Sequence, residues 1–415
     1  MSDRPISRRD LLKSMAVGSA ALAFGACAAA VTTPEPGGSS ATPGPTSSAA
    51  TSAPPIPASP TAPPPSPSPG TGLTLRETIA GLLIVGFRGA ALSDAEWLAA
   101  AIGDAHLGGV ILFDRDQKSR GLRNVVSPRQ LTRLVTDLHD AAGGRGLIVS
   151  VDQEGGIVTR LSPAHGFPAV ASEAVIGKAG TVAGAAKWGR GIAQTLASVG
   201  INLNFAPVVD LNVNPRSPAI GALDRSFSAD PDVVVAMATA EIEAHRTAGV
   251  RSTLKHFPGI GSSTTNTDFG VADVTKTWTR RELEPFRRLI EAGTADVVMA
   301  GHVVNGQLDP DHPASLSNKT VTDLLRGELG WTGTVVTDDL QAAAIDAAFG
   351  FDEAVLLALE AGNDLLLFAN QQTYDPDVIS RVVEVVAAAV EGGRLPATRI
   401  DEAFGRVARL VGTTG

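Results

Sequence analysis

Charged and polar side chains recur along this chain directly after short apolar runs. They are Asp152, Asn204 (with Asp210 farther on), Lys255-His256, His302 and Asp338-Asp339. Where strands are buried on both sides, polar residues at their carboxyl ends are expected mainly where they bind or react with a ligand. The set is mostly acidic, with one lysine and two histidines, which favours a neutral or polyhydroxy ligand held by carboxylates.

The strand end at Lys255-His256 runs into a long polar loop that extends to Gly270. Pro258, Gly259 and Gly261 follow within six residues, and such residues turn the backbone sharply. The sequence therefore predicts a loop that leaves a cation and an imidazole facing a cavity.

Eight candidate strands would position these side chains. They are Leu83–Phe87, Gly109–Phe113, Leu147–Asp152, Asn202–Val209, Ser252–His256, Asp296–His302, Thr334–Asp338 and Asp364–Phe368. Helical spacing marks Pro128–Ala142, Val233–Thr247, Arg280–Ala292, Asp352–Ala361, Ile379–Glu391 and Arg399–Val411. Ser127 and Asp230 each precede a proline, as N-caps do. The alternation over residues 73–415 predicts a single (β/α)8 TIM barrel rather than a doubly wound sheet.

Composition narrows the class of protein. The chain has 415 residues, enough for one large barrel or two ordinary domains, and its net charge of −9 argues against a nucleic-acid partner. Cys27 is the only cysteine, which excludes a disulfide framework or a cysteine zinc site. No His/Cys cluster has ligand spacing, so we expect neither metal nor organic cofactor. The apolar runs after the N-terminus are too short for a membrane span.

Residues 1–27 resemble a twin-arginine export signal. Arg8-Arg9 precedes an apolar segment, 15–26, that is too short to remain as a spanning helix. Cys27 follows Gly25-Ala26, as at a bacterial lipoprotein cleavage site, although Phe24 is unusual there. We expect lipid attachment at Cys27, which would hold the protein on the outer face of the cell membrane. The alternative is ordinary cleavage and a secreted product.

Residues 28–72 consist almost entirely of Pro, Ser, Thr, Ala and Gly, with Glu35 as the only charge. Such a segment has too little apolar surface to form a core, so we expect a disordered linker with polyproline character. At about 3.1 Å per residue it could hold the folded part on the order of 100 Å from the membrane.

Several motifs in order resemble the bacterial family 3 glycoside hydrolases, in their single-domain β-N-acetylglucosaminidase branch. They are Asp152-Gln153-Glu154-Gly155-Gly156 with Arg160, the segment 204–210, Leu223–Phe227, Lys255–Gly259, Val298–His302 and Thr337-Asp338-Asp339-Leu340. The resemblance covers Leu73 to Gly415. It implies an exo-acting hydrolase that removes terminal β-linked N-acetylglucosamine from peptidoglycan fragments, with retention of configuration.

The same resemblance makes Asp338 the nucleophile, because retaining hydrolysis needs an ionised carboxylate to attack the anomeric carbon. Neighbours in a strand point to opposite faces, so Asp339 would not share the site, and we expect it to cap the following helix. The alternative is that both aspartates are caps or surface charges.

The resemblance also assigns sugar-binding residues: Asp152, Arg160, Arg225, Lys255, His256 and His302. A carboxylate and the planar fork of an arginine are both suited to sugar hydroxyls. His256 could instead be a core histidine that is bonded to the backbone. Likewise, the segment 152–156 could be a simple turn before a helix. Asp210 could be a ligand or a partner of an arginine or lysine.

One part of the loop after Lys255 departs from the family. That branch has an Asp-Ser-His triplet there, whose histidine is the acid/base, whereas this chain has Asn266-Thr267-Asp268. Three interpretations remain open. Asp268 serves as the acid with a raised pKa, an acid such as Glu154 comes from elsewhere, or the barrel binds sugar without hydrolysing it. A β-glucosidase of the same family would carry its acid on an additional C-terminal domain, which this chain's length disfavours.

Overall fold

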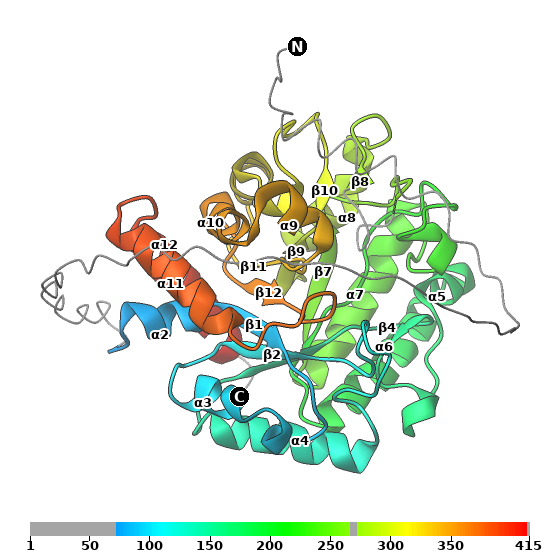
Figure 1. Cartoon of the computed structure of the whole chain (residues 1–415). Coiled ribbons are helices and arrows are strands. Elements are labelled where there is room, and N and C mark those ends of the chain that lie inside the picture. Colours follow the sequence, from blue (N-terminus) through cyan, green and yellow to red (C-terminus); the bar gives the residue numbers. More distant parts are fainter. Residues whose placement is uncertain (1–71, 266–271, 413–415) are drawn as a thin grey trace, which may run out of the picture.

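A computed structural model describes residues 72–265 and 272–412, which form one barrel of parallel strands surrounded by helices (Figure 1). The strands are β1 (Leu83–Gly86), β2 (Gly109–Leu112), β3 (Ile148–Val151), β6 (Leu203–Asn204), β7 (Arg251–Phe257), β9 (Val297–Ala300), β11 (Thr334–Thr337) and β12 (Leu366–Phe368). All eight lie within or overlap the runs expected from sequence. The signal segment 1–27 and almost all of the linker 28–72 lie outside the described residues.

The strands pair in the order β11-β9-β7-β6-β3-β2-β1-β12, and every pairing is parallel. A further parallel bridge between Val336 and Leu365 joins β11 to β12 and brings the two ends of the sheet together. This arrangement confirms the (β/α)8 barrel. Because the strands run parallel around the barrel, their carboxyl ends all lie on one face.

Helices follow the strands in the expected alternation. They are α2 (Leu75–Ala80), α3 (Glu96–Gly103), α4 (Pro128–Ala141), α5 (Glu173–Ala179), α6 (Val182–Ser198), α7 (Pro231–Thr247), α8 (Glu284–Glu291), α9 (Ala343–Phe349), α10 (Phe351–Ala361), α11 (Val378–Glu391) and α12 (Ala397–Gly412). A π-helical segment, Lys319–Glu328, follows β9. Ser127 begins α4 with a capping box, and the Asp230 side chain accepts a hydrogen bond from Asp232 N, so both predicted N-caps are confirmed.

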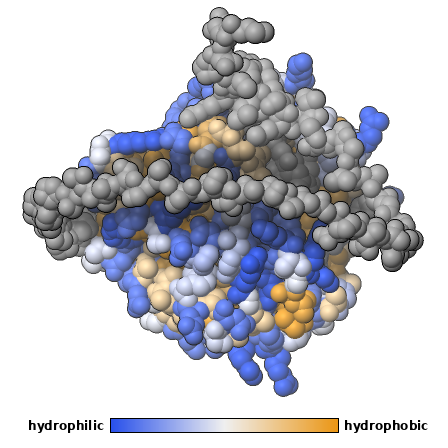
Figure 2. Space-filling view, in the orientation of Figure 1, coloured by the Kyte–Doolittle hydropathy of each residue, from blue (hydrophilic) through white to orange (hydrophobic). Residues whose placement is uncertain are grey.

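Burial explains why the strand sequences are continuous apolar runs. Every residue of β1, β2, β3 and β9 is buried, because one face of each strand packs inside the barrel and the other packs against helices. On the face shown in Figure 2, hydrophilic residues dominate and hydrophobic ones form small separate patches. No helix of the described residues is long and apolar enough to cross a membrane.

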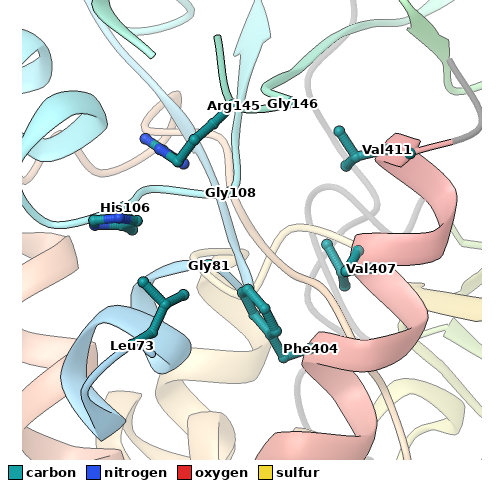
Figure 3. Close-up of a pocket in the computed structure, with 11 residues that line it drawn as sticks. Leu73, Gly81, His106, Gly108, Arg145, Gly146, Phe404, Val407 and Val411 are labelled. Carbon is teal, nitrogen blue, oxygen red and sulfur yellow. The ribbon is translucent and has the colours of Figure 1, made fainter. Parts of the chain in front are cut away.

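A hollow of about 310 Å³ lies at the opposite end of the barrel from the catalytic candidates (Figure 3). Gly81, Gly108 and Gly146 line it, each just before β1, β2 or β3, and Phe404 and Val407 of α12 form an apolar wall. Arg145 also lines it and donates a hydrogen bond to the carbonyl of Ile102. None of its lining residues is a carboxylate, so it is not a site for glycoside chemistry.

The seam between β11 and β12 contains a buried charge cluster. The fully buried carboxylate of Asp364 lies 2.6 Å from Arg326 Nη2, 3.2 Å from Arg399 Nη2 and 3.1 Å from Arg406 Nη1. The same carboxylate accepts a hydrogen bond from the amide of Val335 in β11. One side chain therefore links the last strand, its neighbour and the helices outside them.

Replacing Asp364 with Asn should lower the free energy of unfolding by about 3–5 kcal/mol, because the arginines would be left without their buried counter-charge. Urea unfolding followed by tryptophan fluorescence measures the change. The control is Asp352→Asn, which removes an exposed ion pair with Arg381 and should cost less than about 1 kcal/mol. Equal losses in the two variants would contradict the importance of this cluster for barrel closure.

Candidate active site

The candidate site lies at the carboxyl ends of β3, β7, β9 and β11, where the sequence placed its polar residues. Its centre is Lys255, whose side chain is almost completely buried. The ammonium nitrogen lies 2.9 Å from Asp152 Oδ1 and 2.6 Å from Glu154 Oε1. Burial opposes the charge on Lys255, but the two carboxylates outweigh it and raise its pKa, so the side chain remains a cation.

Glu154 joins Lys255 to Arg225. The guanidinium of Arg225 donates from Nε to Glu154 Oε2 at 2.8 Å and from Nη2 to Oε1 at 2.7 Å, and from Nη1 to the carbonyl of Ala219. The planar fork that sequence analysis directed toward a sugar is therefore engaged by a protein carboxylate. The bidentate face of Arg225 points to Glu154, and its expected contact with a sugar stays a prediction.

Glu154 is poorly suited to be the acid that sequence analysis considered. Burial alone would raise its pKa, but the charges of Arg225 and Lys255 outweigh burial and hold the pKa well below its usual range. A general acid must carry a proton near the working pH, so a carboxylate held in its ionised form cannot serve. This finding argues against Glu154 as the acid, and Asp268 lies outside the described residues.

Asp152 and Arg160 lie side by side at the mouth of the site. Asp152 Oδ2 is 3.6 Å from Arg160 Nη2, and Asp114 Oδ1 is 3.9 Å from Arg160 Nη1. The guanidinium also lies over the ring of Phe113, 5.3 Å from its centroid. Both side chains of the Asp152–Arg160 pair keep some exposure, so they remain available to a ligand that enters from solvent.

His256 forms a buried dyad with Asp210. The distance from His256 Nδ1 to Asp210 Oδ2 is 2.8 Å, and Asp210 also accepts hydrogen bonds from the backbone amides of His256 and Ile260. Asp210 thus orients a histidine and a turn, whereas sequence analysis considered an arginine or lysine as its partner. A carboxylate on Nδ1 fixes the ring orientation and directs Nε2 away from Asp210.

Asp338 follows β11, and its carboxylate accepts a hydrogen bond from the amide of Asp339 at 2.9 Å. Burial alone would raise its pKa, but the charged forms of His302 and His256, the Asp339 amide and the charge of Lys255 outweigh burial and lower it. A partly exposed carboxylate held in its ionised form among cations has the protonation state that a nucleophile requires.

The neighbouring residues have structural partners. The Asp339 carboxylate accepts hydrogen bonds from the amides of Gln341 and Ala369, while α9 begins later, at Ala343. The expected helix cap is therefore wrong, and Asp339 instead ties β11 to the strand end after β12. His302 Nδ1 lies 2.7 Å from Ser315 Oγ, and Nε2 lies 2.7 Å from the Asp339 carbonyl. Any contact of a ligand with these nitrogens would compete with existing bonds.

A second layer of buried carboxylates lies behind the site and was missed by sequence analysis. Glu173 accepts a hydrogen bond from the amide of Val208, and both oxygens of Glu241 lack a partner. Burial raises the pKa of each well above its usual range, and the charge of Glu154 raises both further. Burial therefore favours the protonated form of both groups. Both lie in helices, where a glutamate in a single sequence is normally interpreted as a surface residue, so the sequence offers no signal.

The residues described contain no group of three or more His, Cys, Asp and Glu side chains that could hold a metal ion. The site is instead a set of paired charges: two carboxylates on Lys255, one carboxylate on Arg225 and one on His256. Such a set can bind hydroxyl groups through charge-assisted hydrogen bonds and present one ionised carboxylate, Asp338, to an electrophilic carbon.

Glu154→Gln should lower the free energy of unfolding at pH 7 by about 3–5 kcal/mol, because Arg225 loses its buried counter-charge. Glu173→Gln should cost about 1 kcal/mol or less, because a protonated glutamic acid and glutamine have the same shape and charge. Urea unfolding of both variants at pH 7 compares an ionised with a protonated buried glutamate. A larger loss for Glu173→Gln would contradict the assignment of these protonation states.

Comparison with known proteins agrees with this geometry. The model of the glycosyl hydrolase family 3 N-terminal domain matches residues 74–410. A β-hexosaminidase of Mycobacterium tuberculosis, LpqI, is 34% identical over 351 residues, with 82% of this chain and 83% of that protein covered. A β-hexosaminidase of Tolumonas auensis is 38% identical over 271 residues, covering 64% of this chain and 76% of that protein.

A solved β-N-acetylhexosaminidase from Beutenbergia cavernae superposes with a TM-score of 0.71 at 34% identity, covering 82% of this chain and 99% of that one. A family 3 β-N-acetylglucosaminidase from a Paenibacillus species gives a TM-score of 0.75 at 35% identity, and this chain covers 63% of that longer protein. The barrel, the motifs around Asp338 and these matches agree, and the chain belongs to glycosyl hydrolase family 3.

Proposed function

We propose that this protein is a retaining exo-β-N-acetylglucosaminidase that releases terminal β-linked N-acetylglucosamine from peptidoglycan-derived fragments. The observation that carries the proposal is the carboxylate of Asp338, held ionised at the end of β11 by the charges of His302, His256 and Lys255. The names of the matched relatives, β-hexosaminidases and β-N-acetylglucosaminidases, support the sugar.

Hydrolysis would proceed in two displacements. An Asp338 oxygen attacks the anomeric carbon as its bond to the leaving-group oxygen breaks, and that oxygen takes a proton from the acid. Water then attacks the glycosyl–Asp338 ester from the face vacated by the leaving group and gives its proton to the same residue, now the base. The released sugar keeps the β configuration because two inversions occur at one carbon.

The sugar ring would be held by the charged side chains at the mouth of the site, Asp152, Lys255 and Arg160. Asp152 can accept hydrogen bonds from ring hydroxyls while Lys255 donates to them, because the two side chains already lie 2.9 Å apart. Arg160, beside Asp152, would reach the same ring edge. Arg225 supports this arrangement through Glu154, which fixes Lys255 from behind.

We assign the acid/base role to Asp268, in the place of the family triplet's histidine. The assignment rests on sequence register, since Asn266-Thr267-Asp268 lies outside the described residues, and on the low pKa of Glu154. The carboxyl group would need to lie about 5–5.5 Å from Asp338 when substrate is bound. Its pKa must also exceed the ordinary value of about 3.9, so that the proton is present at the working pH.

Export and anchoring complete the proposal. The twin-arginine-like segment would carry the protein across the membrane, a lipid on Cys27 would retain it, and residues 28–72 would extend the barrel into the cell wall. This placement would bring the active site to peptidoglycan fragments. The muropeptide or carbohydrate is the proposed small-molecule partner, and the membrane is contacted only through the lipid.

A second candidate function is a carbohydrate-binding lipoprotein without hydrolytic activity. The observation that favours it is the absence of the family histidine from the Asn266-Thr267-Asp268 register. In that case Asp152, Lys255 and Arg160 would still hold a sugar, and Asp338 would be one more hydrogen-bond acceptor.

Asp338→Asn should reduce kcat/KM for an aryl β-N-acetylglucosaminide by on the order of 10⁴-fold or more, because the amide cannot form the glycosyl ester. Asp346→Asn, an exposed change on α9, should leave the rate unchanged. If wild type and Asp338→Asn are equally inert while calorimetry detects N-acetylglucosamine binding to both, the second candidate function is correct.

Asp268→Asn should reduce hydrolysis of a natural disaccharide by roughly 10²–10⁴-fold and affect an aryl glycoside much less, because a good leaving group does not need a proton. The two substrates are assayed side by side, with Asp273→Asn as the matched change at an exposed aspartate of the same connection. Equal effects on both substrates would exclude Asp268 as the acid.

A further inference from the structure

A buried glutamate lies behind the turn that follows β7. Glu282 belongs to a short 3-10 segment, Arg280–Leu283, that precedes α8, and only 1% of its surface is exposed. Its Oε2 accepts a hydrogen bond from the amide of Ser262 at 3.2 Å. A Cβ added at Gly259 would come within 2.8 Å of Glu282 Cβ, so the turn and this side chain are in direct contact.

The carboxyl group of Glu282 is only half satisfied. Its Oε1 has no hydrogen-bond partner, and the adjacent hydroxyl oxygen of Ser262, also buried, has none either. A buried carboxylate with one unpaired oxygen is costly to ionise. The same group as a neutral acid keeps the bond from the Ser262 amide and carries no charge.

A second carboxylate holds the same turn from the other side. Asp210 accepts hydrogen bonds from the amides of Ile260 and His256 and from the His256 ring. Asp210 and Glu282 thus accept hydrogen bonds from backbone amides of the same segment, 256–262. The first residue of this segment, His256, acts electrostatically on Asp338. The indole of Trp278 adds a hydrogen bond to the Pro258 carbonyl.

The surroundings of Glu282 favour its neutral form. Burial raises its pKa to about 7, the nearby polar groups of Ser262 oppose this rise, and the charge of Asp210 adds to it. Among the described residues, Asp210 is the carboxylate whose charge acts on Glu282, and the His256 ring is bonded to Asp210. Ionisation would place two buried negative charges behind one turn.

We propose that Glu282 is a positioning residue whose neutral form holds the turn 256–262, and with it His256, in place for the reaction at Asp338. The inference rests on the proposed hydrolytic function. It adds a reason why hydrolytic activity should be lost at high pH. Loss of the Glu282 proton places a second negative charge behind the turn, where it repels Asp210 and displaces Asp210 together with the Ile260 amide and the His256 ring that are bound to it. Activity should therefore fall as pH rises through about 7.

The decisive variant is Glu282→Gln, which keeps the shape and the acceptor for the Ser262 amide but cannot ionise. Wild-type kcat/KM on an aryl β-N-acetylglucosaminide should fall about tenfold per pH unit above the ionisation, chiefly through kcat. The variant should keep most of the wild-type rate at pH 6, and its alkaline limb should lie at least one pH unit higher. An unchanged alkaline limb in Glu282→Gln overturns the proposal.

Glu284→Gln is the matched control, because Glu284 lies two residues farther on, is partly exposed and pairs with Arg287 instead of the turn. Its pH profile should coincide with that of wild type. A shift equal to that of Glu282→Gln would show a general charge effect and would also overturn the proposal.

A readout without catalysis separates this inference from the proposed function. Amide hydrogen-exchange protection at Ile260, whose amide binds Asp210, should be at least tenfold lower in wild type than in Glu282→Gln at pH 8.5, and similar at pH 5.5. The wild-type free energy of unfolding should fall relative to the variant between about pH 5 and 7 and then level off, because the unfolded chain releases its proton first. An inert protein that shows both effects would refute only the hydrolytic function. Equal protection at both pH values would refute the role of Glu282.

Discussion

Lys255 occupies the position on which the rest of the site depends, a buried cation between Asp152 and Glu154. Burying one ammonium group in a protein interior costs several kcal/mol unless opposite charges compensate it. Compensation here comes from Asp152 and Glu154, which both lie in the segment after β3, so that segment is joined by charge to β7. The same pairing fixes the direction of Asp152 toward the mouth of the site and leaves Glu154 to hold Arg225.

Buried glutamates of this chain differ in their protonation state because their surroundings differ. For Glu154, burial favours protonation, but Arg225 and Lys255 outweigh it and the group is ionised. Glu173 and Glu241 have no cation at hydrogen-bond distance in the described structure, and burial leaves them neutral. Glu282 lies between these cases, with a pKa of about 7. One barrel therefore holds both charged and neutral carboxyl groups near its candidate site.

The barrel makes these pairings possible because it brings distant segments to one rim. Asp152 and Lys255 are 103 residues apart, and Asp338 lies farther along still, yet all follow strands that end on the same face. The charge cluster of Asp364 closes the seam between β11 and β12 at their amino-terminal ends, where Asp364 binds the amide of Val335, whereas Asp338 follows the carboxyl end of β11. Closure and chemistry thus depend on opposite ends of the same strand.

The sequence by itself determined the eight strands, most of the helices and the polar residues at the strand ends, because apolar runs, capping residues and turn residues act over a few positions. It also placed Asp338 after β11. Only the tertiary structure decided the partners: Arg225 binds Glu154 rather than facing outward, Asp210 holds His256, and Asp339 binds backbone amides instead of capping α9. Partners depend on distances between residues far apart in the chain, and on burial that decides which carboxyl groups keep a proton. A single sequence records neither quantity.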